Sequence, residues 1–238
     1  MKKINANIII NTYNGNQKEL LLAVNSCLNQ KKCNIKLIVS TVYGDPSIKT
    51  LDDFNLKIVK SKKPGIYSQL NAAVKEITEE WWCYMSGNDI AYPEKIFSEV
   101  SCCLSNNAKI CYSAFDRYDL FTKKLSRKSF HNYSFEKHLE GNFVTDVATM
   151  HKSVSDEYGP FLEEFDNLGY WDFWLRVGQN HPEYFTYNKN PTFKYVVSSE
   201  SRHVKRKNNK KWQEKEFKDR VKMLKRFGPL RGIYKEGF

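Results

Sequence analysis

The sequence contains no run of eighteen apolar residues and no two cysteines in C-x-x-C spacing. The first absence argues against a membrane-spanning helix, and the second argues against a structural zinc site. The chain passes from Met1 into a short β-branched run without an apolar leader, so we expect no signal peptide. Its six cysteines lie mostly in apolar segments, as packed and reduced thiols do. These absences together predict a cytoplasmic protein.

Acidic residues are scarce at the C-terminal end of the chain. From Arg202 to Phe238 there are 14 Lys/Arg and 4 Asp/Glu; because the whole chain has 38 and 27, the preceding residues have 24 and 23. The body is thus nearly neutral, whereas the tail is basic. A basic tail attracts polyanions such as nucleic acids, anionic lipids and nucleotides. A nucleic-acid-binding protein usually spreads positive charge over its folded face, so we expect no nucleic acid as a partner and keep that class as an alternative.

Strands and helices alternate through the first half of the sequence. Apolar, β-branched or aromatic runs predict four strands, at residues 7–11, 35–39, 56–59 and 81–85. Periodic apolar residues predict helices between them, at residues 17–30 and from Gly65 onward. This alternation is typical of βαβ crossovers and of a mainly parallel sheet. The sequence therefore predicts an α/β protein, for which 238 residues and a hydrophobic content of 41% are ample.

Polar residues follow three of these predicted strands at the point where each strand ends. The residues concerned are Asn11–Asn14, Ser40–Thr41 and Ser86–Asp89. The carboxyl ends of parallel strands meet at one edge of a sheet, where open α/β sheets bind their ligands, so we expect a nucleotide site at this edge. Asp89 offers that site a carboxylate oxygen, which is the kind of ligand that a hard divalent cation prefers. The alternative is an ordinary turn before Pro93.

The second half of the chain is less regular. We expect strands at residues 110–115, 144–150 and 193–197, and helices at residues 93–104, 170–177 and 210–227. Aromatic side chains occupy most of the circumference of the helix at residues 170–177, so this helix is expected to be buried or to line a pocket.

Five short segments follow one another in the order of a known set of motifs. They are Ile8–Asn14 (IIINTYN), Gly65–Asn71 (GIYSQLN), Tyr84–Asp89 (YMSGND), Tyr158–Phe161 (YGPF) and Trp171–Arg176 (WDFWLR). The chain from about Asn7 to His203 resembles the inverting glycosyltransferase family 2, which has the GT-A fold. The segments are similar to that family's nucleotide loop, its Gly-Ile-Tyr-Asp segment, its Asp-x-Asp metal motif and two acceptor-side signatures.

The resemblance implies a single GT-A domain at residues 1–205, Rossmann-like, with a mainly parallel central sheet flanked by helices. Residues 1–92 would form its nucleotide-sugar-binding half and residues 93–205 its acceptor-binding half, followed by a basic amphipathic helical tail at residues 206–238. The implied activity is that of a hexosyltransferase, which moves a sugar from a nucleotide-sugar donor, favoured to be a UDP-sugar, to a glycan or lipid-linked acceptor. The family inverts the anomeric carbon by a single displacement.

Roles for individual residues follow from the motifs that they match. For the nucleotide-sugar, the resemblance implies contacts from Thr12, Tyr13, Asn14, Ser40, Gly65, Asn71 and Asn88. For Mn²⁺ or Mg²⁺, it implies Asp89 as a ligand, joined by His203 at a position where relatives close over the phosphates. A single carboxylate can hold such an ion because the donor's phosphates and water complete the coordination. A simple turn after the first strand and an exposed loop histidine are the corresponding alternatives.

The chain departs from the family pattern at three positions. Ser40 lies where the second strand typically leads into an acid that recognises the base, Ser68 replaces the acid of the Gly-Ile-Tyr-Asp segment, and Tyr170 replaces the usual catalytic base. A GT-A domain that binds nucleotide-sugar or glycan without turning it over is therefore an alternative.

The catalytic base is predicted to be Asp172, the only acid of the aromatic helix. Tryptophans on either side would raise its pKa by desolvation, which suits proton abstraction near neutral pH. Asp166 and Glu164 lie just upstream as further candidates. A structural acid that pairs with Arg176 four residues later is an equally open alternative.

Apolar residues recur among the charged residues of the basic tail. They are Trp212, Phe217, Val221, Leu224, Phe227 and Leu230. A helix here would carry an apolar stripe flanked by Lys and Arg. Such a helix either lies on an anionic membrane surface, which suits lipid-linked acceptors and a peripheral location, or docks on its own domain.

Overall fold

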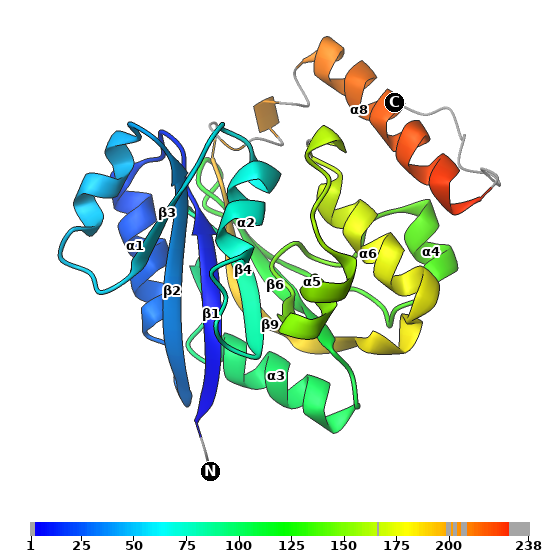
Figure 1. Cartoon of the computed structure of the whole chain (residues 1–238), viewed down its shortest axis with the longest axis horizontal. Coiled ribbons are helices and arrows are strands. Elements are labelled where there is room, and N and C mark those ends of the chain that lie inside the picture. Colours follow the sequence, from blue (N-terminus) through cyan, green and yellow to red (C-terminus); the bar gives the residue numbers. More distant parts are fainter. Residues whose placement is uncertain (1–2, 166, 199–200, 202–203, 206–208, 229–238) are drawn as a thin grey trace.

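One nine-stranded sheet runs through both halves of the chain, with the strand order β3-β2-β1-β4-β8-β6-β9-β5 and with β7 paired to β6. The computed structural model describes residues 3–165, 167–198, 201, 204–205 and 209–228. Figure 1 shows α4, α5 and α6 gathered on one side of the molecule, with α8 alongside them. The protein therefore has the α/β architecture that the sequence predicts.

The N-terminal part of the sheet consists of four parallel strands. They are β1 (Ile4–Asn11), β2 (Cys33–Val42), β3 (Lys57–Ser61) and β4 (Trp81–Ser86). Consecutive residues of β1 and β4 are buried, because a parallel strand covered on both faces has no polar side. The helices α1 (Gln17–Leu28) and α2 (Ile66–Val74) follow β1 and β3 along the chain. All four strands and both helices were expected from the sequence pattern.

The C-terminal part of the sheet is mixed. Its strands are β5 (Ile90–Ala91), β6 (Ile110–Asp119), β7 (Leu125–Lys128), β8 (Thr149–His151) and β9 (Phe185–Val197). Strand β8 is antiparallel to both β4 and β6, whereas β6 and β9 are parallel. The short β8 therefore joins two blocks of strands that run in the same direction.

The described part of the chain contains five further α-helices. They are α3 (Lys95–Ser105), α4 (Phe135–Glu140), α5 (Lys152–Tyr158), α6 (Gly169–Asn180) and α8 (Lys210–Leu224). Short 3₁₀ turns lie at Pro46–Leu51, Glu163–Phe165, Pro182–Tyr184 and Lys225–Phe227. The aromatic helix α6 is buried over most of its surface, as predicted. Among the described residues, no helix has the length and apolar character needed to cross a bilayer.

Strands β5 and β7 were not expected from the sequence, and two of the expected strands differ clearly in their bounds. Strand β8 has three residues instead of the predicted 144–150, because the residues before it form a turn in which the Ala148 N–H donates to the Thr145 carbonyl at 3.1 Å. Strand β9 begins at Phe185, well before the predicted residue 193. Pro191 interrupts the local strand pattern, but it pairs with Ala114 where the register shifts, and a bulge tolerates a residue that has no N–H.

The helix α8 docks on its own domain, which is one of the two alternatives for the basic tail. Met223 and Leu224 are buried in a cluster with Trp171 and other apolar side chains of α6 and of the 3₁₀ turn at Glu163–Phe165. The Arg220 guanidinium lies 5.0 Å from the Trp171 ring and donates to the Glu140 carbonyl at 2.8 Å. Phe217, in contrast, is 42% exposed. The contact face is therefore rotated from the predicted stripe, of which Leu230 lies outside the described residues.

We predict that Met223→Ala lowers the free energy of unfolding by about 2–5 kcal/mol, because it removes a fully buried side chain. Lys218→Ala is the control on the exposed face of the same helix, and we expect a change below about 0.5 kcal/mol there. Urea unfolding of the two variants measures both values. Equal effects from the two substitutions would show that α8 is not docked through the face described.

Candidate active site

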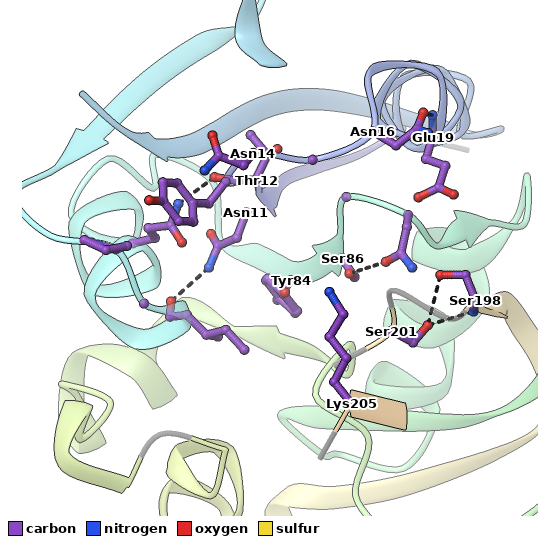
Figure 2. Close-up of a pocket in the computed structure, with 18 residues that line it drawn as sticks. Asn11, Thr12, Asn14, Asn16, Glu19, Tyr84, Ser86, Ser198, Ser201 and Lys205 are labelled. Atoms are coloured by element: carbon purple, nitrogen blue, oxygen red, sulfur yellow. Dashed lines mark hydrogen bonds between the residues drawn. The ribbon is translucent and has the colours of Figure 1, made fainter. Parts of the chain in front are cut away.

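An open cleft of about 1110 Å³ lies at the carboxyl ends of β1 and β4, beside the start of α2. Figure 2 shows its lining residues, which come from four separate parts of the chain. Polar groups from the loop after β1, from the end of β4 and from the segment after β9 face the same space. This is the edge at which the sequence predicts a ligand site.

The loop after β1 brings Thr12, Tyr13 and Asn14 to the cleft, as predicted. The Thr12 hydroxyl lies 3.1 Å from that of Ser47, and its backbone N–H donates to the Ser40 carbonyl at 2.9 Å. Asn14 has a positive φ of 49°, a conformation that asparagine tolerates better than most residues. The ring of Tyr13 is 51% exposed. The loop thus offers a fixed polar backbone and one accessible aromatic ring.

A buried carboxylate that the sequence analysis did not single out holds this loop. Asp45 accepts hydrogen bonds from the Thr41 hydroxyl at 2.6 Å, the Ser47 N–H at 2.9 Å and the Asn14 N–H at 3.3 Å. Burial by itself would raise the pKa of Asp45, but these hydrogen bonds outweigh it and lower the pKa. The signal in the sequence was an acid shortly after the second strand, where the family pattern also has one.

The start of α2 forms a second wall of the cleft. Gly65 lines it with a φ of 140°, a conformation open to glycine and strained for other residues. The Gln69 amide donates to the Thr12 carbonyl at 2.7 Å, and the Asn11 amide donates to the Ile66 carbonyl at 2.9 Å. The Asn11 Oδ1 accepts no hydrogen bond from the described residues. The buried Asn11 Oδ1 at the end of β1 is therefore an acceptor without a donor among the described residues.

Two predicted nucleotide contacts lie behind this wall and do not line the cleft. Ser40 is fully buried, and its hydroxyl donates to the Gln69 carbonyl at 2.7 Å. The Asn71 amide donates to the Phe161 carbonyl at 2.8 Å and accepts from the Phe161 N–H at 2.9 Å. In the structure, both side chains fix α2 and do not face the ligand space.

The end of β4 brings Asn88, but not Asp89, to the cleft. The Ser86 hydroxyl donates to Asn88 Oδ1 at 2.6 Å, and the Asn88 amide donates to the Val196 carbonyl at 3.3 Å. Asp89 is 3% exposed, and its Oδ1 accepts from the Val196 N–H at 2.9 Å. Burial raises the pKa of Asp89 to about 7. Together the two side chains clamp the end of β9.

These residues fit a divalent cation poorly. A carboxylate ligand must face the ion, whereas Asp89 does not line the cleft and its Oδ1 already accepts from the Val196 N–H. No cluster of three or more His, Cys, Asp or Glu side chains suited to a metal occurs within the described ranges. His203 lies outside those ranges. The expected Mn²⁺ or Mg²⁺ stays a prediction.

The segment after β9 closes the remaining side with residues that the sequence analysis did not single out. Ser198, Ser201 and Lys205 line the cleft. The Ser198 N–H donates to the Ser201 hydroxyl at 2.8 Å, and the Lys205 N–H donates to the Ser201 carbonyl at 3.1 Å, one helical turn later. Figure 2 shows the Lys205 amine pointing into the cleft. The basic composition of this region was its only sequence signal.

Asp172 lies away from the cleft. It is fully buried, its Oδ2 accepts from the Arg176 guanidinium at 2.9 Å, and its Oδ1 accepts from Arg226. Burial raises the pKa of Asp172, opposed by the two arginines. The pairing with Arg176 was one of the two alternatives for this residue. Of the further candidates, Glu164 pairs with Lys222 at the surface, and Asp166 is not among the described residues.

An aromatic wall separates the cleft from α6. Tyr84 lines the cleft, and its ring lies 5.7 Å from the ring of Tyr170, the residue found where the family has its base. Tyr170 is buried, its hydroxyl has no hydrogen-bond partner within the described residues, and burial raises its pKa well above the usual value. Asp146, in the loop before β8, is close enough to raise the Tyr170 pKa further.

Asp146 is a carboxylate that the sequence analysis missed. Its side chain is exposed, yet desolvation by the protein around it raises the pKa of its carboxyl to about 7. Its neighbours Val144 and Val147 are buried. No motif marks this residue, because it follows a stretch without a regular pattern.

We predict that Asp89 makes the stability of the protein depend on pH. The pKa of its carboxyl is 3.8 in the unfolded chain and about 7 in the folded state, so the folded state holds the proton more tightly and stability falls as the pH rises from about 4 to 7. Each unit of difference corresponds to about 1.4 kcal/mol. Asp89→Asn, which keeps an acceptor for Val196, should flatten this dependence. Urea unfolding at pH 5 and pH 8 provides the test, and equal slopes in wild type and variant would contradict the assignment.

Comparisons with known proteins agree with this geometry. The family described as Glycosyl transferase family 2 matches residues 7–161. The structure of S. aureus TarS 1-349 in complex with UDP aligns with a TM-score of 0.67 and 13% identity, covering 93% of this chain and 64% of that one. The complex with UDP-GlcNAc gives 0.63 and 14%, covering 85% and 61%. The structure of S. aureus TarS gives 0.65 and 14%, covering 83% and 37%.

The chain thus spans less than two thirds of the length of these solved structures. No curated protein matches the sequence. The family match nevertheless covers most of the chain, from β1 to Phe161, and so includes the loop after β1, the start of α2 and the end of β4 that form the cleft. The chain therefore belongs to glycosyl transferase family 2 and has the GT-A fold.

Proposed function

We propose that the protein transfers a sugar from a UDP-sugar to a glycan or lipid-linked acceptor with inversion at the anomeric carbon. The observation that carries this proposal is the polar cleft at the carboxyl ends of β1 and β4, in a chain of this family. Structures with a similar fold are described as complexes with UDP and UDP-GlcNAc. Peripheral contact of the basic tail with a membrane stays a prediction.

The nucleoside is assigned to the loop after β1 and the start of α2. Tyr13 offers an exposed ring for stacking. Thr12 and Asn14 are held by Ser47 and Asp45, so the site is formed before the ligand binds. A pre-formed site reduces the entropy lost on binding.

The transfer requires a base for the acceptor hydroxyl. Asp172 is engaged on both oxygens by Arg176 and Arg226, which leaves it poorly placed to accept a proton. Asp146 combines exposure with a pKa of about 7, close to the pH at which a base works best. Asp146 does not line the cleft itself, but it lies within electrostatic reach of Tyr170, whose ring packs against that of the cleft residue Tyr84. We therefore assign the base to Asp146.

A second candidate function is binding of a nucleotide-sugar without transfer. It is favoured by Tyr170, a buried aromatic residue at the position where the family has an acid. The two functions share the cleft and differ in turnover, so measurement of sugar transfer and of donor hydrolysis separates them.

We expect Tyr13→Ala to weaken UDP binding by about two- to tenfold, since an aromatic contact of this kind is worth about 0.5–1.5 kcal/mol. Tyr43→Ala is the matched control, because Tyr43 is 72% exposed and does not line the cleft. Isothermal titration calorimetry with UDP, with GDP as the comparison nucleotide, measures both affinities. Unchanged UDP binding by the Tyr13 variant would show that the nucleoside does not bind against this loop.

We expect Asp146→Asn to lower the rate of transfer by about 10²–10⁴-fold at unchanged UDP affinity, as loss of a general base does. Asp172→Asn should instead lower the free energy of unfolding by about 3–5 kcal/mol, because it leaves two arginines without their shared carboxylate. Its rate per folded molecule should stay within a few-fold of wild type. A large loss of transfer rate in Asp172→Asn, together with a nearly unchanged rate in Asp146→Asn, would show that Asp172 is the base.

A further inference from the structure

The diphosphate of the donor requires a positive group in the cleft to stabilise the leaving UDP, and among the described residues that group is not the expected metal site. When the bond between the anomeric carbon and the β-phosphate oxygen breaks, its electron pair stays on that oxygen, so negative charge grows on the leaving UDP. A positive group must lie beside the phosphates to stabilise this charge. Asp89, the expected metal ligand, is buried and bonded to Val196 and does not reach the cleft.

Lys205 is the one cationic side chain among the described residues that line the cleft. Its amine points into the open space near the ends of β1 and β4 (Figure 2). Ser198 and Ser201 line the same cleft, and the Ser198 N–H donates to the Ser201 hydroxyl (Figure 2). A lysine with neighbouring hydroxyl groups provides a point charge and hydrogen-bond donors, which are the groups that bind phosphate oxygens.

The polar end of β4 positions this lysine. Asn88 and Asp89 hold the Val196 carbonyl and N–H, near the end of β9. Beyond β9, the Ser198 N–H donates to the Ser201 hydroxyl, and the Ser201 carbonyl accepts from the backbone N–H of Lys205. Asn88 and Asp89, which match the family's metal motif, are thus hydrogen-bonded to the end of β9, and Lys205 lies shortly after that strand.

We infer that Lys205 takes the place of a divalent cation and neutralises the leaving diphosphate, an inference that rests on the proposed function of the cleft. In the transfer step the acceptor oxygen bonds to the anomeric carbon as the bond from that carbon to the β-phosphate oxygen breaks. The acceptor proton passes to the carboxylate assigned as the base. The leaving UDP keeps the electron pair, and its charge is stabilised by the Lys205 ammonium with the hydroxyls of Ser198 and Ser201.

The test is calorimetric titration of the full chain with UDP and with uridine, each in EDTA and in Mn²⁺. We expect UDP to bind the wild type in EDTA with an affinity within about threefold of that in Mn²⁺. Lys205→Ala should weaken UDP binding in EDTA by at least about tenfold, as expected for loss of a charge-assisted contact, and should leave uridine binding unchanged. Lys205→Arg should recover most of the loss. Lys218→Ala, on the exposed face of α8 and outside the cleft, is the control.

Two results would overturn the inference while leaving the proposed function intact: UDP binding that disappears in EDTA and returns with Mn²⁺, or equal UDP affinity of wild type and Lys205→Ala. A loss of uridine binding by Lys205→Ala would also overturn it, because the lysine would then act through the shape of the site. If wild type binds neither UDP nor uridine under any of these conditions, the proposed function itself fails.

Discussion

The register of β1 between its two parallel neighbours is the constraint on which the site depends. Asn11 pairs with Ser40 of β2 on one side and with Ser86 of β4 on the other. The three strands therefore end at the same level, and the loops that leave them lie side by side. A shift of the register by one residue would turn the side chains of a strand to the opposite face of the sheet. In a strand that alternates apolar and polar residues, such a shift would bury the polar side chains. The run Ile8–Ile10 is apolar on both faces, so its pattern opposes the shift less strongly. The polar ties between loops supply the missing specificity.

Those ties are made by buried polar side chains, two of which, Ser40 and Asp45, do not line the cleft. Gln69 bonds the Thr12 carbonyl, Ser40 bonds the Gln69 carbonyl, and Asp45 gathers the loop residues around itself. Each is buried and hydrogen-bonded, as buried polar groups must be to avoid a large desolvation cost. They form a frame that holds Tyr13 and Asn14 at the cleft.

The sequence predicted the fold well where structure is local and the site less well where it depends on burial. The positions of strands β1 to β4, and the edge at which their polar ends meet, follow from periodicity alone. The predicted β9 was too short because Pro191 breaks the local strand pattern, and the bulge that accommodates this proline depends on the partner strand. Motif position also could not show that Asp89 and Asp172 are buried and bonded. Lys205 was missed because its role depends on the path of the chain after β9, which no local pattern encodes.

The most direct test of the account is a crystal structure of the protein grown with UDP in the presence of EDTA. The account predicts the uracil and ribose against the loop after β1, with the β-phosphate within hydrogen-bond distance of the Lys205 amine and with Asp89 still bonded to Val196. Density for UDP away from this cleft would contradict the assignment of the site. A structure that holds UDP only when Mn²⁺ is added, with the ion bound to Asp89, would contradict the role given to Lys205.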